Sequence, residues 1–157
     1  MHNGANAWPG RLGPALVWGV TVALFAAFFA LQDWARWQAA PATILGRIGV
    51  FAACHGLGGA VAGALAAGLF GRVGAAGWAL AFLGGVAVTL LGGLLGGAVF
   101  GLFGTPGVGA PLVESAIRVG MGPLTVPLAV AQRPALAAIW LVGIVAAHLR
   151  RRAGAPA

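Results

Sequence analysis

His55 is the residue whose chemistry draws attention first, because imidazole is the side chain whose charge can change near neutral pH. It lies in the uncharged stretch FAACHGLGGAVAG, and an ionisable residue inside an apolar span is a functional candidate. Three roles fit it: a neutral histidine bonded to a backbone carbonyl or a threonine, an axial ligand for haem or chlorophyll, and a proton relay. His2 lies in the N-terminal tail and His148 near the end of the last apolar stretch. Bis-histidine haem would therefore need His55 from two copies of the chain.

Cys54 directly precedes His55, but neighbouring residues on a helix point about 100° apart. No carboxylate lies nearby in the sequence, so we predict no metal site at this pair. Cys54 is also the only cysteine of the chain, which excludes a disulfide within it.

Glu114 and Arg118 are the second candidate group, four residues apart in PLVESAIRVGMG. This spacing places both side chains on one face of a helix, and the stretch predicts a short amphipathic helix lying in the outer membrane interface. Two interpretations stay open: a solvated connector, and a lid or re-entrant gate over the bundle. Thr89 and Gln132 are further polar residues that could line a path through the membrane.

Composition argues against an enzyme and against a nucleic-acid-binding protein. The chain has two acidic residues, one cysteine, no tyrosine and no lysine, which is poor material for a catalytic site. The formal net charge of +7 comes from arginines scattered between apolar stretches, whereas nucleic-acid binding needs a basic face. We predict no cofactor beyond the haem or chlorophyll option at His55.

The elements that must position these residues are membrane helices. The chain is 61% hydrophobic and 7% charged, whereas about a quarter of the residues in soluble domains are charged. We predict an all-α integral membrane protein with a single membrane domain over residues 12–149. Its four-helix bundle comprises spans long enough to cross about 30 Å of hydrocarbon, at residues 12–31, 48–70, 75–103 and 132–149.

The segment 105–131 is too rich in glycine and proline for a simple span, so we predict an interfacial or re-entrant segment, with a fifth span as the alternative. The tails, 1–11 and 150–157, flank the domain. Three consecutive arginines directly follow the last span, and the positive-inside rule places such charges in the cytoplasm. Both termini are therefore predicted to be cytoplasmic, in a bacterial inner membrane.

Small residues recur at every fourth position of the third span, a pattern typical of closely packed membrane helices. The second span carries a similar stripe that includes His55, and we expect His55 to lie opposite Gly96 and Gly97 of the antiparallel third span. The near-repeats LGGAVAG and LGGAVFG fit convergent packing of two neighbouring helices. The predicted packing glycines are Gly59, Gly63, Gly85, Gly93, Gly97 and Gly101, and the aromatic residues expected on the surface of the first span are Trp18, Phe25, Phe28 and Phe29.

Three functions follow from these observations. The first is a non-catalytic accessory or assembly subunit, which packs with itself or with a larger membrane complex through the glycine faces. The alternative is a small homo-oligomeric channel or transporter whose path includes His55 or Thr89. The third is a haem- or pigment-binding subunit that uses His55.

Overall fold

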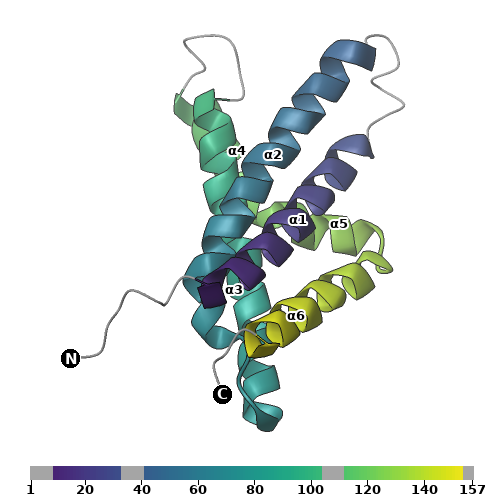
Figure 1. Cartoon of the computed structure of the whole chain (residues 1–157). Coiled ribbons are helices and arrows are strands. Elements are labelled where there is room, and N and C mark those ends of the chain that lie inside the picture. The colour runs from purple at the N-terminus through teal and green to yellow at the C-terminus, as the bar shows by residue number, and fades with distance from the viewer. Residues whose placement is uncertain (1–8, 33–40, 104–111, 154–157) are drawn as a thin grey trace, which may run out of the picture.

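The computed structural model describes residues 9–32, 41–103 and 112–153, and every regular element in these ranges is a helix (Figure 1). Three stretches are long and apolar enough to cross a membrane: Gly10–Leu31, Leu45–Leu69 and Gly74–Leu102. The elements are α1 (Pro9–Leu31), α2 (Pro41–Leu65), η3 (Ala66–Leu69), α3 (Gly74–Phe103), α4 (Leu112–Met121), η4 (Gly122–Leu124), α5 (Thr125–Gln132) and α6 (Leu136–Ala153).

Helix α2 packs between α1 and α3, and glycines on two of its faces allow close approach. On the face toward α3, a Cβ atom at Gly58 would overlap the backbone of Gly92 and Gly96. On the face toward α1, a Cβ atom at Gly59 would lie 2.7 Å from the carbonyl oxygen of Trp18. Helices gain little from hiding apolar side chains from lipid, so close backbone contacts of this kind are a main source of their association.

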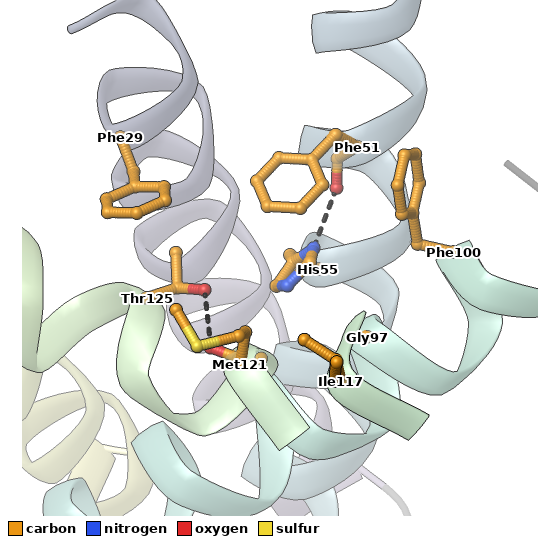
Figure 2. A pocket seen from close by; sticks show the side chains of 9 residues that line it. Phe29, Phe51, His55, Gly97, Phe100, Ile117, Met121 and Thr125 are labelled. Carbon is orange, nitrogen blue, oxygen red and sulfur yellow. Dashed lines mark hydrogen bonds between the residues drawn. The ribbon is translucent and has the colours of Figure 1, made fainter. Parts of the chain in front are cut away.

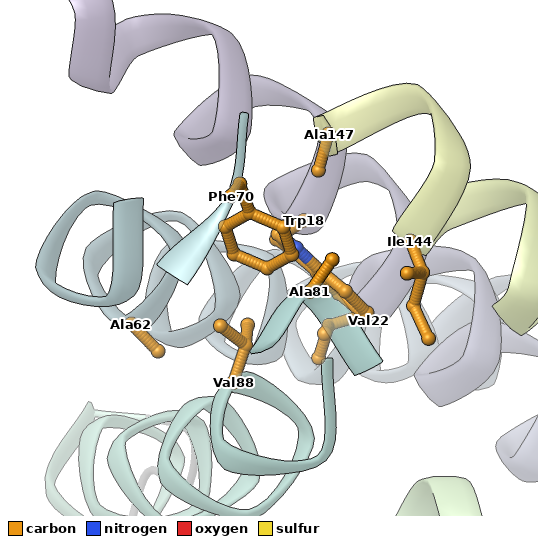
Figure 3. Close-up of a cluster of buried hydrophobic side chains, with 8 residues drawn as sticks. All are labelled: Trp18, Val22, Ala62, Phe70, Ala81, Val88, Ile144 and Ala147. Carbon is orange, nitrogen blue, oxygen red and sulfur yellow. The ribbon is translucent and has the colours of Figure 1, made fainter. Parts of the chain in front are cut away.

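The core is built around Trp18, which is fully buried among side chains of α1, α2, α3 and α6 (Figure 3). The prediction that aromatic residues of the first span lie on its surface was wrong for Trp18 and for Phe25, which is 2% exposed. Glycines of the neighbouring helices make the room, because Gly63 would place a Cβ atom 3.0 Å from the Trp18 Cβ atom and Gly85 would place one 3.4 Å from its Cη2 atom. Phe28 and Phe29 are half-buried.

The connection between α2 and α3 is tight and makes them antiparallel, as its length predicts. Gly71 and Gly74 have φ values of 83° and 79°, in the left-handed region that favours glycine. Phe70 of this connection is buried against Trp18, with ring centroids 6.3 Å apart. Helix α2 itself begins at Pro41, earlier than the predicted residue 48, because the exposed Arg47 does not interrupt the helix.

The C-terminal third, for which an interfacial or re-entrant segment and a fourth span are predicted, contains the three helices α4, α5 and α6. Helix α4 runs beside α3, α5 lies across the bundle and α6 returns beside α1 (Figure 1). The predicted span 132–149 begins later, at Leu136 of α6, because α5 ends at Gln132 and Arg133 is extended before Pro134. The described part of the segment 105–131 packs along α3 and reaches the middle of that helix. A Cβ atom at Gly122 would overlap the carbonyl oxygen of Gly93, inside α3.

The start of α1 and the end of α6 lie at the same end of the bundle as the α2–α3 connection (Figure 1). A Cβ atom at Gly10 or at Gly71 would collide with the Arg151 side chain. We call this the basic end, because it carries Arg11, Arg72, Arg150, Arg151 and Arg152. The opposite end contains the last turn of α1, the first turns of α2 and the last turn of α3.

Candidate functional site

His55 is held in one orientation by its own helix. Its Nδ1 atom lies 2.9 Å from the carbonyl oxygen of Phe51, one turn earlier in α2. A carbonyl oxygen can only accept a hydrogen bond, so in the neutral ring Nδ1 carries the proton and Nε2 keeps a lone pair. The residue is 1% exposed, and its Nε2 atom has no hydrogen-bond partner.

A cavity of about 190 Å³ lies against the His55 ring. Figure 2 shows the second ring nitrogen on the side that faces Thr125 and Met121. The hydroxyl group of Thr125 donates to the carbonyl oxygen of Met121 over 3.5 Å, a long hydrogen bond. The walls come from α1, α2, α3, α4, η4 and α5, and comprise Phe29, Phe51, His55, Gly97, Phe100, Ile117, Met121, Gly122 and Thr125.

The lining of this cavity is mostly apolar, and aromatic rings make up much of it. Phe51 lies against His55 with ring centroids 4.1 Å apart, and Phe100 meets Phe51 edge to face at 5.1 Å. Among the side chains that the structure describes, none that lines the cavity is charged. The cavity therefore offers π faces, one imidazole acceptor and one hydroxyl group.

Glycines of α3 make room for the imidazole, as the sequence predicted. A Cβ atom at Gly96 would lie 3.0 Å from the Cγ atom of His55, and Gly97 lines the cavity. Toward the basic end, a Cβ atom at Gly92 would lie 2.9 Å from the Cα atom of Gly59. The cavity is thus closed on that side by backbone contact between α2 and α3.

Thr89, the other buried candidate, lies outside this cavity lining. Its hydroxyl group donates to the carbonyl oxygen of Gly85 over 2.8 Å and accepts a hydrogen bond of 2.9 Å from Nε1 of Trp140. With donor and acceptor both used, Thr89 ties α3 to α6. Gln132 is exposed at the end of α5.

Glu114 and Arg118 both fall within α4, and their spacing places them on one face of that helix. Their side-chain contacts lie outside the described part of the chain. Ile117, between them in sequence, reaches the His55 cavity. The position of α4 beside that cavity is compatible with the predicted lid, which stays a prediction.

The six predicted packing glycines all lie near another helix of the same chain. Gly59 and Gly63 approach α1, and Gly85 lies against Ile144 of α6. Gly93 contacts Gly122 of η4. A Cβ atom at Gly122 would also lie 3.4 Å from the Cα atom of Gly97. A Cβ atom at Gly101 would lie 3.7 Å from Val119 of α4. Whether these faces also contact a partner stays a prediction.

Metal and cofactor options depend on His55 alone. Within the described ranges, no group of three histidine, cysteine or acidic residues is arranged to hold a metal ion. A histidine whose Nδ1 atom donates to a carbonyl is arranged as metal-binding histidines are, and the thioether of Met121 lines the same cavity. The cavity of about 190 Å³ is nevertheless smaller than typical ligand sites of about 300 to 1,000 Å³. The cavity of a single chain is therefore too small to enclose a porphyrin, and haem shared between two copies of the chain stays a prediction.

Of the nine lining residues, the sequence interpretation named His55 and Gly97 for this site and missed the other seven: Phe29, Phe51, Phe100, Ile117, Met121, Gly122 and Thr125. Phe51 could have been found, because it precedes His55 by one helical turn and so shares its face. Met121 and Thr125 reach the cavity only because the chain turns at η4, beside Pro123. No pattern in the sequence indicates the depth of that turn.

Searches against protein families, curated proteins and solved structures find no match for this chain. The site is therefore interpreted from its own geometry.

Proposed function

We propose that this chain is a small, non-catalytic channel or transporter of a bacterial inner membrane, which binds a small hydrogen-bond-donating solute at His55. The observation that carries the proposal is the buried Nε2 atom without a partner, beside a cavity. An unsatisfied buried polar group costs about 1 to 3 kcal/mol. A solute that donates a hydrogen bond to Nε2 would recover part of that free energy.

The lining favours a neutral or a small monovalent cationic solute. Three phenyl rings surround the cavity, those of Phe29, Phe51 and Phe100, and the face of an aromatic ring attracts cations. An anion would find no positively charged partner among the lining side chains that the structure describes. Ammonium and protonated primary amines combine N–H donors with a single positive charge on a small ion, so they match this chemistry.

The interrupted C-terminal region supports transport through a fourth crossing that is made of two separate helices, α4 of 10 residues and α6 of 18 residues. We propose that α4 and α6 form this crossing together, with α5 across the middle of the membrane. Discontinuous helices of this kind form substrate sites near the midplane of many transporters. Arginines gather at the basic end, so the positive-inside rule favours a cytoplasmic location for that end and for both termini.

Access from the opposite end would then be controlled by Phe51 and Phe100. Both rings lie between that end and His55. Phe51 is one helical turn closer to that end than His55, and Phe100 is one helical turn closer to it than Gly96. Their edge-to-face contact closes the cavity from above, and the Gly59–Gly92 contact closes it from below. We propose that movement of η4 and α5 opens the lower side.

Reconstituted protein tests this function directly. Liposomes that contain the protein and an internal pH dye should respond faster to an external methylammonium pulse than empty liposomes do. His55→Ala should remove the protein-dependent part, whereas Leu57→Ala, a matched change at an exposed position of the same helix, should preserve it. An equal response of empty and protein-containing liposomes would refute the proposal for this solute class.

An accessory or assembly subunit remains the second candidate, and one observation favours it. The first turns of α2 extend beyond their neighbours, because a Cβ atom at Gly46 or Gly49 would meet nothing within 4 Å, and Leu45 and Val50 are exposed. A second copy or a larger membrane complex could pack there. Native mass measurement in mild detergent should then reveal an assembly that Gly49→Leu disrupts and Gly68→Leu, at another open glycine, does not.

A further inference from the structure

A long apolar groove runs between α1 and α6, on the other side of α1 from the His55 cavity. It consists of two hollows, of about 360 Å³ and about 300 Å³. Both are lined by Leu24 and Ile139, so they form one continuous feature. The groove extends along α1 from Leu16 to Leu31.

The dimensions and the lining of the groove match a lipid acyl chain. From Leu16 to Leu31, α1 rises about 22 Å at 1.5 Å per residue, and one leaflet contributes about half of the roughly 30 Å of hydrocarbon. The helix is therefore long enough to accompany one chain through its leaflet. The hydroxyl group of Thr21 lines the groove but donates to the carbonyl oxygen of Val17 over 2.8 Å, so the surface it presents is largely apolar.

A positive charge stands at one end of this groove. Arg150 belongs to its lining at the basic end, and its Cβ atom lies 3.3 Å from the position of a Cβ atom at Gly13 of α1. The chain has two acidic residues: Asp33 follows the far end of α1, and Glu114 lies in α4. The helix ends at the basic end therefore contain five arginine side chains and no acidic side chain.

We infer that the groove binds one anionic glycerophospholipid, with an acyl chain between α1 and α6 and its phosphate group on Arg150. Arginine suits this role because its planar guanidinium group forms charge-assisted hydrogen bonds to phosphate oxygens. Basic pockets between membrane helices on the cytoplasmic side are known recognition sites for anionic head groups. The site is separate from the His55 cavity and does not depend on the proposed transport.

Native mass spectrometry of the delipidated full chain tests this inference. After addition of phosphatidylglycerol or phosphatidylcholine at equal concentration, we expect one bound phosphatidylglycerol per chain and about tenfold weaker retention of phosphatidylcholine. Arg150→Gln should remove this preference. Arg152→Gln is the matched control, since it makes the same change of charge two residues further along α6 and lies outside the groove lining. Equal retention of both lipids, or equal effects of the two variants, would overturn the inference.

A second variant separates the acyl chain from the head group. Val20→Trp should fill the groove without changing its charge and should reduce phosphatidylglycerol binding, whereas Val61→Trp, on an exposed part of α2, should leave it unchanged. Glycerol phosphate, which lacks acyl chains, should not compete with the lipid at equal concentration. Full competition by glycerol phosphate, or unchanged binding in Val20→Trp, would show that the groove is not the site.

Discussion

The two buried histidines of this chain occupy contrasting environments. Both side chains are almost completely inaccessible, at 1% exposed for His55 and 0% for His148, and both have an Nε2 atom without a partner. His55 donates from Nδ1 to a carbonyl of its own helix. His148 accepts at Nδ1 a hydrogen bond of 3.2 Å from the backbone N–H of Gly71, which lies 77 residues away in sequence. The two neutral rings are therefore expected in opposite tautomers.

This difference separates a structural histidine from a candidate functional one. The His148 ring stacks on Trp78 with centroids 4.2 Å apart and joins α6 to the α2–α3 connection. The hydrogen bond of His55 joins no second element, and its free nitrogen lies beside a cavity. Its hydrogen bond links no two helices, so we propose a functional role for His55 and a structural role for His148.

Removal of His148 should produce the largest effect on stability. His148→Ala removes the acceptor for the Gly71 N–H group and leaves space beside Trp78, so we expect the free energy of unfolding to fall by about 2 to 4 kcal/mol. Denaturant titration in detergent micelles, followed by tryptophan fluorescence, measures this. Stability equal to that of the unmodified chain would remove the distinction between the two histidines.

An added methyl group beside His55 should have the next largest effect. Gly96→Ala would place a Cβ atom 2.5 Å from the His55 Cα atom and 3.0 Å from its Cγ atom, so α2 and α3 would have to separate slightly, and such overpacking typically costs about 1 to 3 kcal/mol. Methylammonium-dependent responses in liposomes should also fall. Gly101→Ala serves as the control, because its Cβ atom would lie at an ordinary contact distance of 3.7 Å from Val119 and should change neither property.

Loss of the Thr89 hydroxyl group should have a smaller effect that is limited to stability. Thr89→Val removes the acceptor of the Trp140 Nε1–H group, so we expect a loss of about 1 kcal/mol and a fluorescence change from Trp140. Transport should continue, because Thr89 does not line the cavity. A complete loss of transport in a folded Thr89→Val variant would place the path elsewhere.

The smallest effect on stability is expected at His55 itself. His55→Phe removes a buried acceptor that has no partner, which can be nearly neutral or stabilising, but it also removes the hydrogen bond from Nδ1 to the Phe51 carbonyl oxygen. Because these two changes oppose each other, the unfolding free energy should change by less than about 0.5 kcal/mol while the response to methylammonium disappears. A large loss of stability would make His55 a structural residue like His148.

Much of the helical architecture could be predicted from the sequence. Long apolar stretches and the short α2–α3 connection indicate antiparallel membrane helices, and the glycine spacing places His55 beside Gly96. The burial of Trp18 could not be predicted, because it depends on which helix faces Gly63 and Gly85. The same holds for the interruption at Arg133 and Pro134 and for the position of η4 beside α3. Both depend on contacts with α1 and α3, which a local sequence pattern does not reveal.

The measurement that tests the central claim most directly is ¹⁵N nuclear magnetic resonance of the histidine rings in lipid bilayers, with and without methylammonium. We predict an unprotonated Nε2 atom in His55 and a protonated one in His148, with a methylammonium-dependent shift confined to the His55 signal. The His55→Phe variant assigns that signal. A protonated Nε2 atom in His55, or a spectrum in which methylammonium moves neither histidine, would contradict the account.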